Sequence, residues 1–196
     1  MAWVIVGLGN PGEEYEGTRH NTGRMALEVF SKTHGFGDWK KDKKASAHVA
    51  SGMLGKVAVV LVAPDTFMNK SGNAVSKFVK SQKAAERMIV VYDDLDLPVG
   101  KLKLSFDRGS GGHRGVESIM KAVKTKKFTR VRVGISPTTA AGALRKPSGD
   151  KEVNTFILAK YKPAELTELK KLFKKAAEAM KATVEQGPFI AMNQFN

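Results

Sequence analysis

His20 and Asp93 are two side chains that could share acid–base chemistry. With an ordinary pKa of about 6.5, a histidine can accept a proton near neutral pH. The simpler interpretation of any single loop histidine is that it has no catalytic role, and nothing in the local sequence favours such a role for His34 or His48. His20 differs if Asp93 accepts a hydrogen bond from one ring nitrogen and leaves the other free to deprotonate water. We therefore predict a general base at His20, conditional on that carboxylate.

Further polar residues are placed where they could meet His20 at one rim of a sheet. Asn10 lies just beyond the first apolar run, and His20 lies in the loop that begins at Asn10. Asp93 and Asp94 follow the run MIVVY, and Asn69 follows VAVVLVA after a short connection. Open α/β sheets bind ligands outside the carboxyl ends of their strands. We therefore expect these side chains to converge.

The run DDLD at Asp93, Asp94 and Asp96 has a second interpretation as a magnesium site, held by two carboxylates and several waters. Neither a P-loop nor a phosphate-handling lysine stands beside it. A strand-end turn closed by Leu97 and Pro98 accounts for Asp96 without a metal. We favour the orienting role of Asp93 over metal binding.

The stretch VIVGLGNPG spaces Gly7, Gly9 and Gly12 as in the G-x-G-x-x-G loop of dinucleotide-binding proteins. That loop needs its last glycine inside a helix whose N-terminus holds the pyrophosphate. Here Pro11 precedes the last glycine, and the following EEYEGTRHN does not make a convincing amphipathic helix. We expect no dinucleotide cofactor. The glycines instead let the loop turn tightly and bring Asn10 close to a ligand.

Basic residues and a second glycine-rich loop suggest contacts with phosphate. GSGGHRG leads into an expected helix, so its N–H groups could hold an anion, unless the loop is a plain flexible turn. Lys101 and Lys103 share one strand face, as do Arg130 and Arg132, because side chains alternate with period two. These pairs predict a phosphate clamp, and a solvated strand face is the alternative.

Composition limits the class of protein. The chain has 196 residues, 42% of them hydrophobic and 27% charged, so it can bury a core. No apolar run reaches the roughly 18 residues of a membrane helix, and we find no secretory signal. The absence of cysteine excludes disulfides, thiolate-bound zinc and cysteine nucleophiles. We expect a cytoplasmic protein.

The charge points to a polyanionic partner. Thirty-three Lys and Arg residues oppose 19 Asp and Glu residues, for a net charge of +14. Each phosphate neutralised by such a surface releases condensed counterions, which favours binding of nucleic acid. The alternative is a basic protein that binds nucleic acid only nonspecifically. The same charge favours a monomer, through repulsion between copies.

Hydrophobic periodicity predicts the elements that must position these residues. Strands are expected at 3–7, 46–52, 57–63, 88–92, 100–105 and 129–135, and helices at 22–34, 70–82 and 115–126. Gly55 predicts a hairpin between the second and third strands. The alternation of strands and helices predicts one α/β domain over residues 1–196, with a mixed β-sheet flanked by helices.

The C-terminal part of the chain contains a long basic helix after a loop. Pro163 fits the first turn of this helix, and Gly187-Pro188 predicts its end. Its lysines lie mostly off the apolar stripe, so they form either a solvated face or a face that contacts RNA. Residues 136–155 are small, polar and rich in Gly and Pro, and we predict that they form a mobile loop or lid.

Four motifs, in this order and spacing, resemble those of the bacterial-type peptidyl-tRNA hydrolases: VGLGNPGEEYEGTRHNTG, PDTFMNKSG, VYDDLDLPVGKLKL and GSGGHRGVESI. The likeness runs from residue 3 to about residue 160, and the basic C-terminal helix also fits. It implies a single α/β domain with a twisted mixed sheet. It also implies an esterase that cuts between a peptide's C-terminal carbonyl and the 3′-terminal ribose of tRNA, which recycles tRNA without a metal or organic cofactor.

The resemblance also implies roles for single residues. His20 in TRHN would be the general base, and Asp93 in YDDLDLP would stabilise and orient it. Asn10 in GNPG would bind the peptide backbone and help to favour blocked over free aminoacyl-tRNA. An ester has a better leaving group than an amide, so one oriented base can suffice without a serine nucleophile.

Other residues would bind the substrate rather than react with it. Tyr15, Phe67 and Asn69 would line the substrate site. Lys103 and Arg132 resemble the basic residues that hold tRNA phosphate.

Arg114 departs from the family pattern, because GGHNG usually carries Asn where this chain has Arg. Asn both donates and accepts hydrogen bonds, whereas Arg only donates and is always charged. We hypothesise that Arg114 contacts a tRNA phosphate or a substrate carbonyl. The departure also keeps open a non-catalytic RNA-binding protein on the same fold. A cofactor-dependent oxidoreductase is a third alternative, which dinucleotide binding would reveal.

Overall fold

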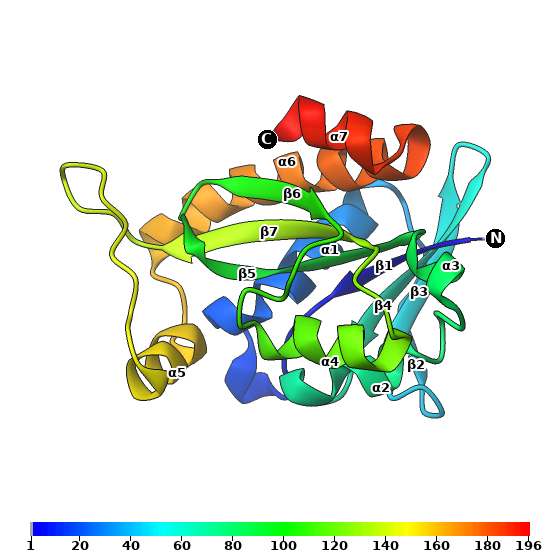
Figure 1. Cartoon of the computed structure of the whole chain (residues 1–196), viewed down its shortest axis with the longest axis horizontal. Helices are drawn as coiled ribbons and strands as arrows, with labels where there is room; N and C mark the ends of the chain where they lie inside the picture. Colours follow the sequence, from blue (N-terminus) through cyan, green and yellow to red (C-terminus); the bar gives the residue numbers. More distant parts are fainter. Residues whose placement is uncertain (1) are drawn as a thin grey trace.

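The computed structural model describes residues 2–196 and contains one seven-stranded sheet, ordered β2-β3-β4-β1-β5-β7-β6 (Figure 1). Its strands are β1 (Trp3–Gly7), β2 (Lys40–Asp42), β3 (Ala47–Leu54), β4 (Val57–Pro64), β5 (Met88–Pro98), β6 (Leu102–Phe106) and β7 (Thr129–Ser136). The central strands β4, β1, β5 and β7 are parallel, and β2, β3 and β6 pair antiparallel at the edges. The predicted mixed sheet is confirmed.

Helices cover both faces of this sheet (Figure 1). They are α1 (Thr22–Thr33), α2 (Ser71–Val75), α3 (Gln82–Ala85), α4 (Arg114–Val123), α5 (Asp150–Leu158), α6 (Pro163–Gln186) and α7 (Pro188–Phe195). Helices α1 and α6 pack together on one face, α2 and α4 pack together on the other, and α7 lies against the edge strand β6. Among residues 2–196, no helix is both long and apolar enough to span a membrane.

The sheet divides the hydrophobic core in two, and β1 shows how. Trp3 and Ile5 belong to the cluster under α1 and α6, whereas Val4 and Val6 belong to the cluster under α2 and α4. Successive side chains of a strand point to opposite faces, so a central strand must be apolar at every position. This burial on both faces fixes where β1 ends, and therefore where the loop that carries Asn10 begins.

Two glycines let α1 approach the end of β1. A Cβ atom at Gly7 would overlap the carbonyl oxygen of Gly23, in the first turn of α1. A Cβ atom at Gly23 would overlap backbone atoms of Leu8 and Val91. Only glycine permits backbones to pack this closely. The start of α1 therefore rests directly on β1 and β5, the strands beside which the polar residues gather.

Some sequence-based boundaries were wrong. The helix expected at 70–82 is two short helices, because the side chain of Ser81 accepts a hydrogen bond from Ala84 N–H and starts α3. Residues 150–155, expected in a loop, form the beginning of α5, where Asp150 and Glu152 favour the positive end of the helix dipole. Strand β5 continues to Pro98, beyond the expected end at 92.

A further helix begins at Gly187-Pro188, where the sequence predicted only the end of a helix. Gly187 ends α6 with a φ of 91°, as predicted, but Pro188 occupies the first turn of a further helix, α7. Proline lacks the N–H that a first helical turn leaves unpaired, so it suits a start as well as a stop. The short edge strand β2 was also missed, since its lysine-rich sequence has no apolar alternation.

We expect Gly23→Ala to lower the free energy of unfolding by about 1–3 kcal/mol, because the added methyl group overlaps the backbone of Leu8, directly after β1, and of Val91 in β5. Urea unfolding followed by circular dichroism measures the change. Gly37→Ala is the matched control, since a Cβ atom there meets no atom within 4 Å. Equal unfolding midpoints for the two variants would contradict the close packing of α1.

Candidate active site

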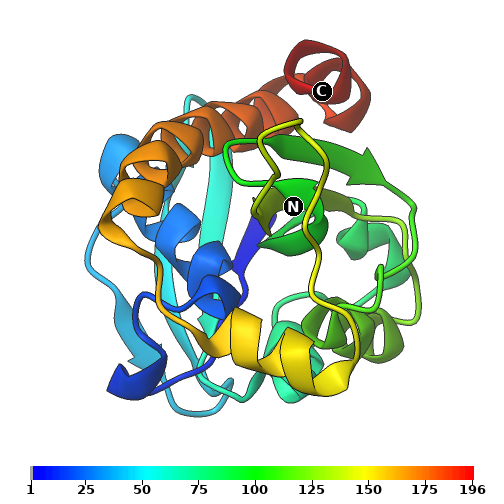
Figure 2. The ribbon, with the colours of Figure 1, turned by 90° about the vertical axis from the view of Figure 1, so that its left-hand side faces the viewer.

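A cavity of about 530 Å³ opens at the carboxyl ends of the central strands. Its wall is built from the end of β5, the loop after β1, the turn η3 (Met68–Lys70), the N-terminus of α4 and one side of α5. Figure 2 looks onto this edge of the molecule, with α5 crossing between the N-terminal segment and α4. The cavity therefore gathers segments from most of the chain, as the strand-end argument predicted.

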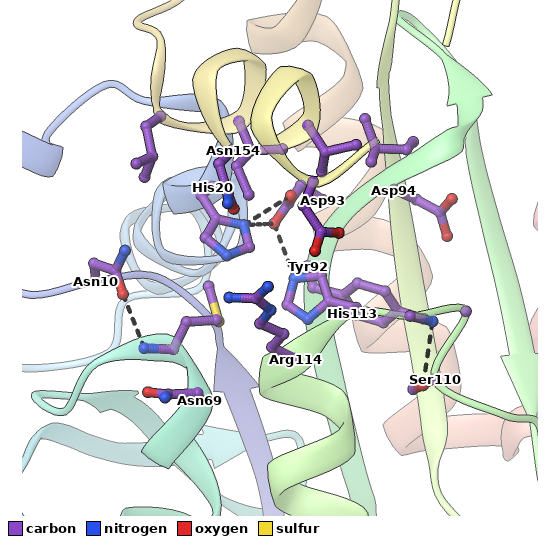
Figure 3. A pocket seen from close by; sticks show the side chains of 18 of the residues that line it. Asn10, His20, Asn69, Tyr92, Asp93, Asp94, Ser110, His113, Arg114 and Asn154 are labelled. Atoms are coloured by element: carbon purple, nitrogen blue, oxygen red, sulfur yellow. Dashed lines mark hydrogen bonds and ion pairs between the residues drawn. The ribbon is translucent and has the colours of Figure 1, made fainter. Parts of the chain in front are cut away.

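Asp93 lies at the centre of the polar cluster in this cavity and is only 4% exposed (Figure 3). Its carboxylate accepts hydrogen bonds from His20 Nδ1, at 3.0 and 3.2 Å, and from His113 Nε2, at 3.1 Å. Burial by itself raises the pKa of Asp93, but the charges and hydrogen bonds of the two histidines hold it far below its ordinary value. Asp93 is therefore held in its ionised form by its two histidine neighbours.

His20 is held with one nitrogen toward Asp93 and the other free. It lies in the turn η2 (Arg19–Asn21), and its side chain is 10% exposed. Nδ1 donates to Asp93, so Nε2 has a free lone pair. Burial lowers the pKa of His20, the charge and hydrogen bond of Asp93 raise it, and the charge of Arg114 lowers it. The net result is a pKa above 6.5, which suits a base near neutral pH.

His113 is a site residue to which sequence reasoning gave no role. It precedes the first turn of α4, where its Nδ1 accepts the N–H of Val116 at 3.3 Å. That nitrogen therefore carries no proton, and Nε2–H is free to donate to Asp93. Its ring packs beside both His20 and Tyr92, with centroid separations of 5.1 and 4.8 Å. The available signal was its position, directly before a predicted helix.

The amide of Asn10 has a fixed orientation. Its Oδ1 accepts the N–H of Met68 at 2.8 Å, so Nδ2 is the atom left to donate into the cavity. Its backbone is held on both sides by Asn21, whose Oδ1 accepts Asn10 N–H and whose Nδ2 donates to Asn10 O. Asn21 is a positioning residue that the sequence did not reveal, although it follows His20 in the same motif.

The turn that carries His20 is tied to the C-terminal half of the chain. Arg19 Nη2 donates to both carboxylate oxygens of Glu165 at 2.9 Å. The guanidinium also lies over the rings of Phe156 and Tyr161, at 4.5 and 5.1 Å from their centroids. Because Arg19 is only 6% exposed, this arrangement is well shielded from water and fixes where His20 points.

The expected substrate-contact residues occupy different places. Phe67, 55% exposed, and Asn69 line the cavity. Tyr15 does not line it, but contacts the Phe67 ring edge-on at a centroid separation of 6.4 Å. Tyr15 therefore contacts a cavity-lining ring rather than the cavity itself.

The residues of the expected phosphate clamp differ in how exposed they are to solvent. Lys103 and Arg132 lie opposite each other on β6 and β7, outside the cavity wall, and Lys103 is exposed. Arg132 Nε donates to Asp94 at 2.6 Å. Arg130 is fully buried and donates to backbone carbonyls of Lys126 and Phe128, so its expected role in a clamp was wrong. The alternation of side chains along a strand indicated that Arg130 and Arg132 share a face, but it did not indicate that Arg130 is buried.

The carboxylates of DDLD do not converge on one ion site. Asp94 is paired with Arg132, and Asp96 with Lys146, while Asp93 turns toward the histidines. Within residues 2–196, the potential metal ligands that gather are those of His20, Asp93 and His113, with ligand atoms within 4.8 Å of one another. Both nitrogens that face Asp93 carry protons, which an ion would have to displace.

Comparison with known proteins gives one consistent result. A family model described as Peptidyl-tRNA hydrolase matches residues 4–196. A peptidyl-tRNA hydrolase of Aquifex aeolicus is 40% identical over 195 residues, covering 98% of this chain and 95% of the relative. One of Chloroflexus aggregans is 38% identical, covering 99% and 98%. A crystal structure of peptidyl-tRNA hydrolase from Acinetobacter baumannii is 32% identical, covers 100% of this chain and 94% of that one, and has a TM-score of 0.87.

We expect Asp93→Asn to lower the pKa of His20, since the charge that raises it is removed while burial and Arg114 still lower it. Titration of the His20 ring signals by NMR measures the change. Asp38→Asn, which removes an exposed carboxylate outside the cavity wall, should leave the pKa of His20 unchanged. A His20 pKa that stays the same or rises in Asp93→Asn would exclude the orienting pair.

Proposed function

Because the chain belongs to the peptidyl-tRNA hydrolase family, we propose that it hydrolyses the ester between peptide and tRNA with His20 as general base. The observation that supports this role is the fixed ring of His20, with Nδ1 donating to Asp93 and Nε2 free in the cavity. A base held within reach of a water molecule contributes about 10²–10⁴-fold to the rate.

The reaction needs one proton acceptor that later becomes a donor. Nε2 of His20 takes a proton from water as the water oxygen bonds to the ester carbonyl carbon. Asp93 stabilises the imidazolium that forms, because its carboxylate faces Nδ1–H. The bond from carbon to the ribose oxygen then breaks, and that oxygen takes the proton from Nε2. The products are a tRNA with a free terminal hydroxyl and a peptide with a free carboxyl group, which releases the second water proton to solvent and becomes a carboxylate.

Asn10 provides a means of selecting a blocked amino group. Its free Nδ2–H can donate to a carbonyl oxygen of the peptide backbone, while its Oδ1 is already used by Met68 N–H. A free aminoacyl ester has an ammonium group there, which only donates. Two donors cannot pair, so we propose that Asn10 favours peptidyl-tRNA over aminoacyl-tRNA.

The tRNA body would be held by charge outside the cavity. Lys103 is exposed, and the guanidinium of Arg132 has N–H groups besides the Nε that donates to Asp94. We propose that these two residues hold a phosphate, with the net charge of +14 attracting the polyanion. We further propose a monomer that acts in the cytoplasm, where its substrate arises during translation.

We expect His20→Ala to lose about 10²–10⁴-fold in the hydrolysis of an N-blocked aminoacyl-tRNA while it still binds tRNA. Release of the labelled amino acid and a filter-binding assay measure the two properties. His48→Ala, a half-exposed histidine on β3 outside the cavity, is the matched control and should keep wild-type activity. Unblocked aminoacyl-tRNA should be spared by the wild type. A wild type that binds tRNA but cleaves nothing would instead indicate an RNA-binding protein.

We also expect kcat/KM to rise with pH, with the midpoint of its acid limb above 6.5. The pKa of His20 is raised in the folded protein, and only its unprotonated form can accept a proton. The pH dependence of kcat/KM for the blocked substrate gives this midpoint. A midpoint below 6.5 would contradict His20 as the base.

A further inference from the structure

Arg114 is solvent-exposed at the cavity wall, and its guanidinium has no protein partner among residues 2–196. It is the first residue of α4 and lines the cavity directly after His113. Within the described residues 2–196, no hydrogen bond or ion pair engages its guanidinium. By contrast, Asp94 is paired with Arg132 and Asp96 with Lys146. An unpaired guanidinium with five N–H donors is suited to an anion that arrives with the substrate.

The position of this guanidinium narrows the choice of anion. Figure 3 shows it extending from α4 toward the rings of His20 and His113, inside the cavity. Its charge is close enough to lower the pKa of His20. In the proposed reaction, the water that His20 activates attacks the ester carbonyl, so a guanidinium beside His20 is also beside that carbonyl. The nearest tRNA phosphate is on the other side of the terminal ribose from that ester, and thus farther from the base.

We propose that Arg114 is a further catalytic residue that donates hydrogen bonds to the carbonyl oxygen of the ester as it becomes an oxyanion. This inference rests on the proposed function, because the oxyanion forms only if water attacks the ester. The neutral donors of Asn10 and Asn69 line the same cavity but carry no charge. A charged donor is worth most where negative charge develops in the transition state, and the exposed, unpaired guanidinium of Arg114 is available for that contact.

The same placement has an opposing effect on the base. A positive charge beside His20 disfavours the imidazolium and so weakens it as a proton acceptor. Asp93 offsets this effect with its own charge and hydrogen bond, and the net pKa of His20 stays raised. Arg114 can therefore stabilise the oxyanion without disabling the base.

The test compares Arg114→Gln with the wild type on two substrates, an N-acetyl-aminoacyl-tRNA and the corresponding 3′-O-(N-acetylaminoacyl)adenosine, which has no phosphate. We expect kcat on the tRNA substrate to fall about 10²–10³-fold with KM changed less than about threefold, and kcat/KM on the adenosine ester to fall similarly. Arg114→Lys should restore part of the rate. The acid limb of kcat/KM should move to higher pH in Arg114→Gln, because a charge that lowers the pKa of His20 is gone.

Lys121→Gln is the matched control, since it removes one exposed positive charge from the last turn of α4, and it should leave hydrolysis of the adenosine ester unchanged. A loss confined to the tRNA substrate, with a raised KM and a weaker dependence on salt, would overturn the proposal in favour of a phosphate contact. Unchanged rates on both substrates would also overturn it. Failure of the wild type to cleave the tRNA substrate would instead reject the proposed function.

Discussion

The buried carboxylate of Asp93 is the interaction on which the rest of the site depends. An ionised group this deep needs hydrogen-bond donors, and it receives them from two imidazoles on separate segments, the turn η2 and the N-terminal end of α4. Each imidazole is also held by a contact outside the cluster. The turn that carries His20 is held by the ion pair of Arg19 with Glu165, and His113 Nδ1 accepts the N–H of Val116. One charge in the middle of β5 thus connects the turn η2 to the start of α4.

Close backbone packing provides the accuracy that this cluster needs. Gly7 and Gly23 bring α1 onto β1, so the loop between them has little freedom, and that loop carries both Asn10 and His20. The hydrogen bonds between Asn21 and the Asn10 backbone then fasten its two ends together. Asn10 and His20, which come from one short loop, therefore keep a fixed relation to each other, as the proposed catalysis by positioned groups requires.

Sequence reasoning succeeded where one physical effect dominated. The central strands could be predicted because burial on both faces makes them apolar throughout, and His20, Asp93 and Asn10 followed from the rule that such strands end at a common edge. It failed where a residue serves two purposes. Gly187-Pro188 both ends α6 and starts α7, and Arg130 shares a face with Arg132 yet is consumed by backbone carbonyls. His113 was missed because nothing in the sequence indicated that Asp93 accepts hydrogen bonds from a second histidine besides His20.

The hydrogen bonds of the two imidazoles also define how many protons the cluster can exchange. Of their four ring nitrogens, two point N–H groups at Asp93 and one accepts from Val116, which leaves the lone pair of His20 Nε2. A second proton could enter only by breaking the start of α4 or by neutralising Asp93, whose pKa is far below its ordinary value. Under the proposed mechanism, the cluster therefore has one proton-accepting atom, and the proton that it takes from water is the one that it returns to the departing ribose.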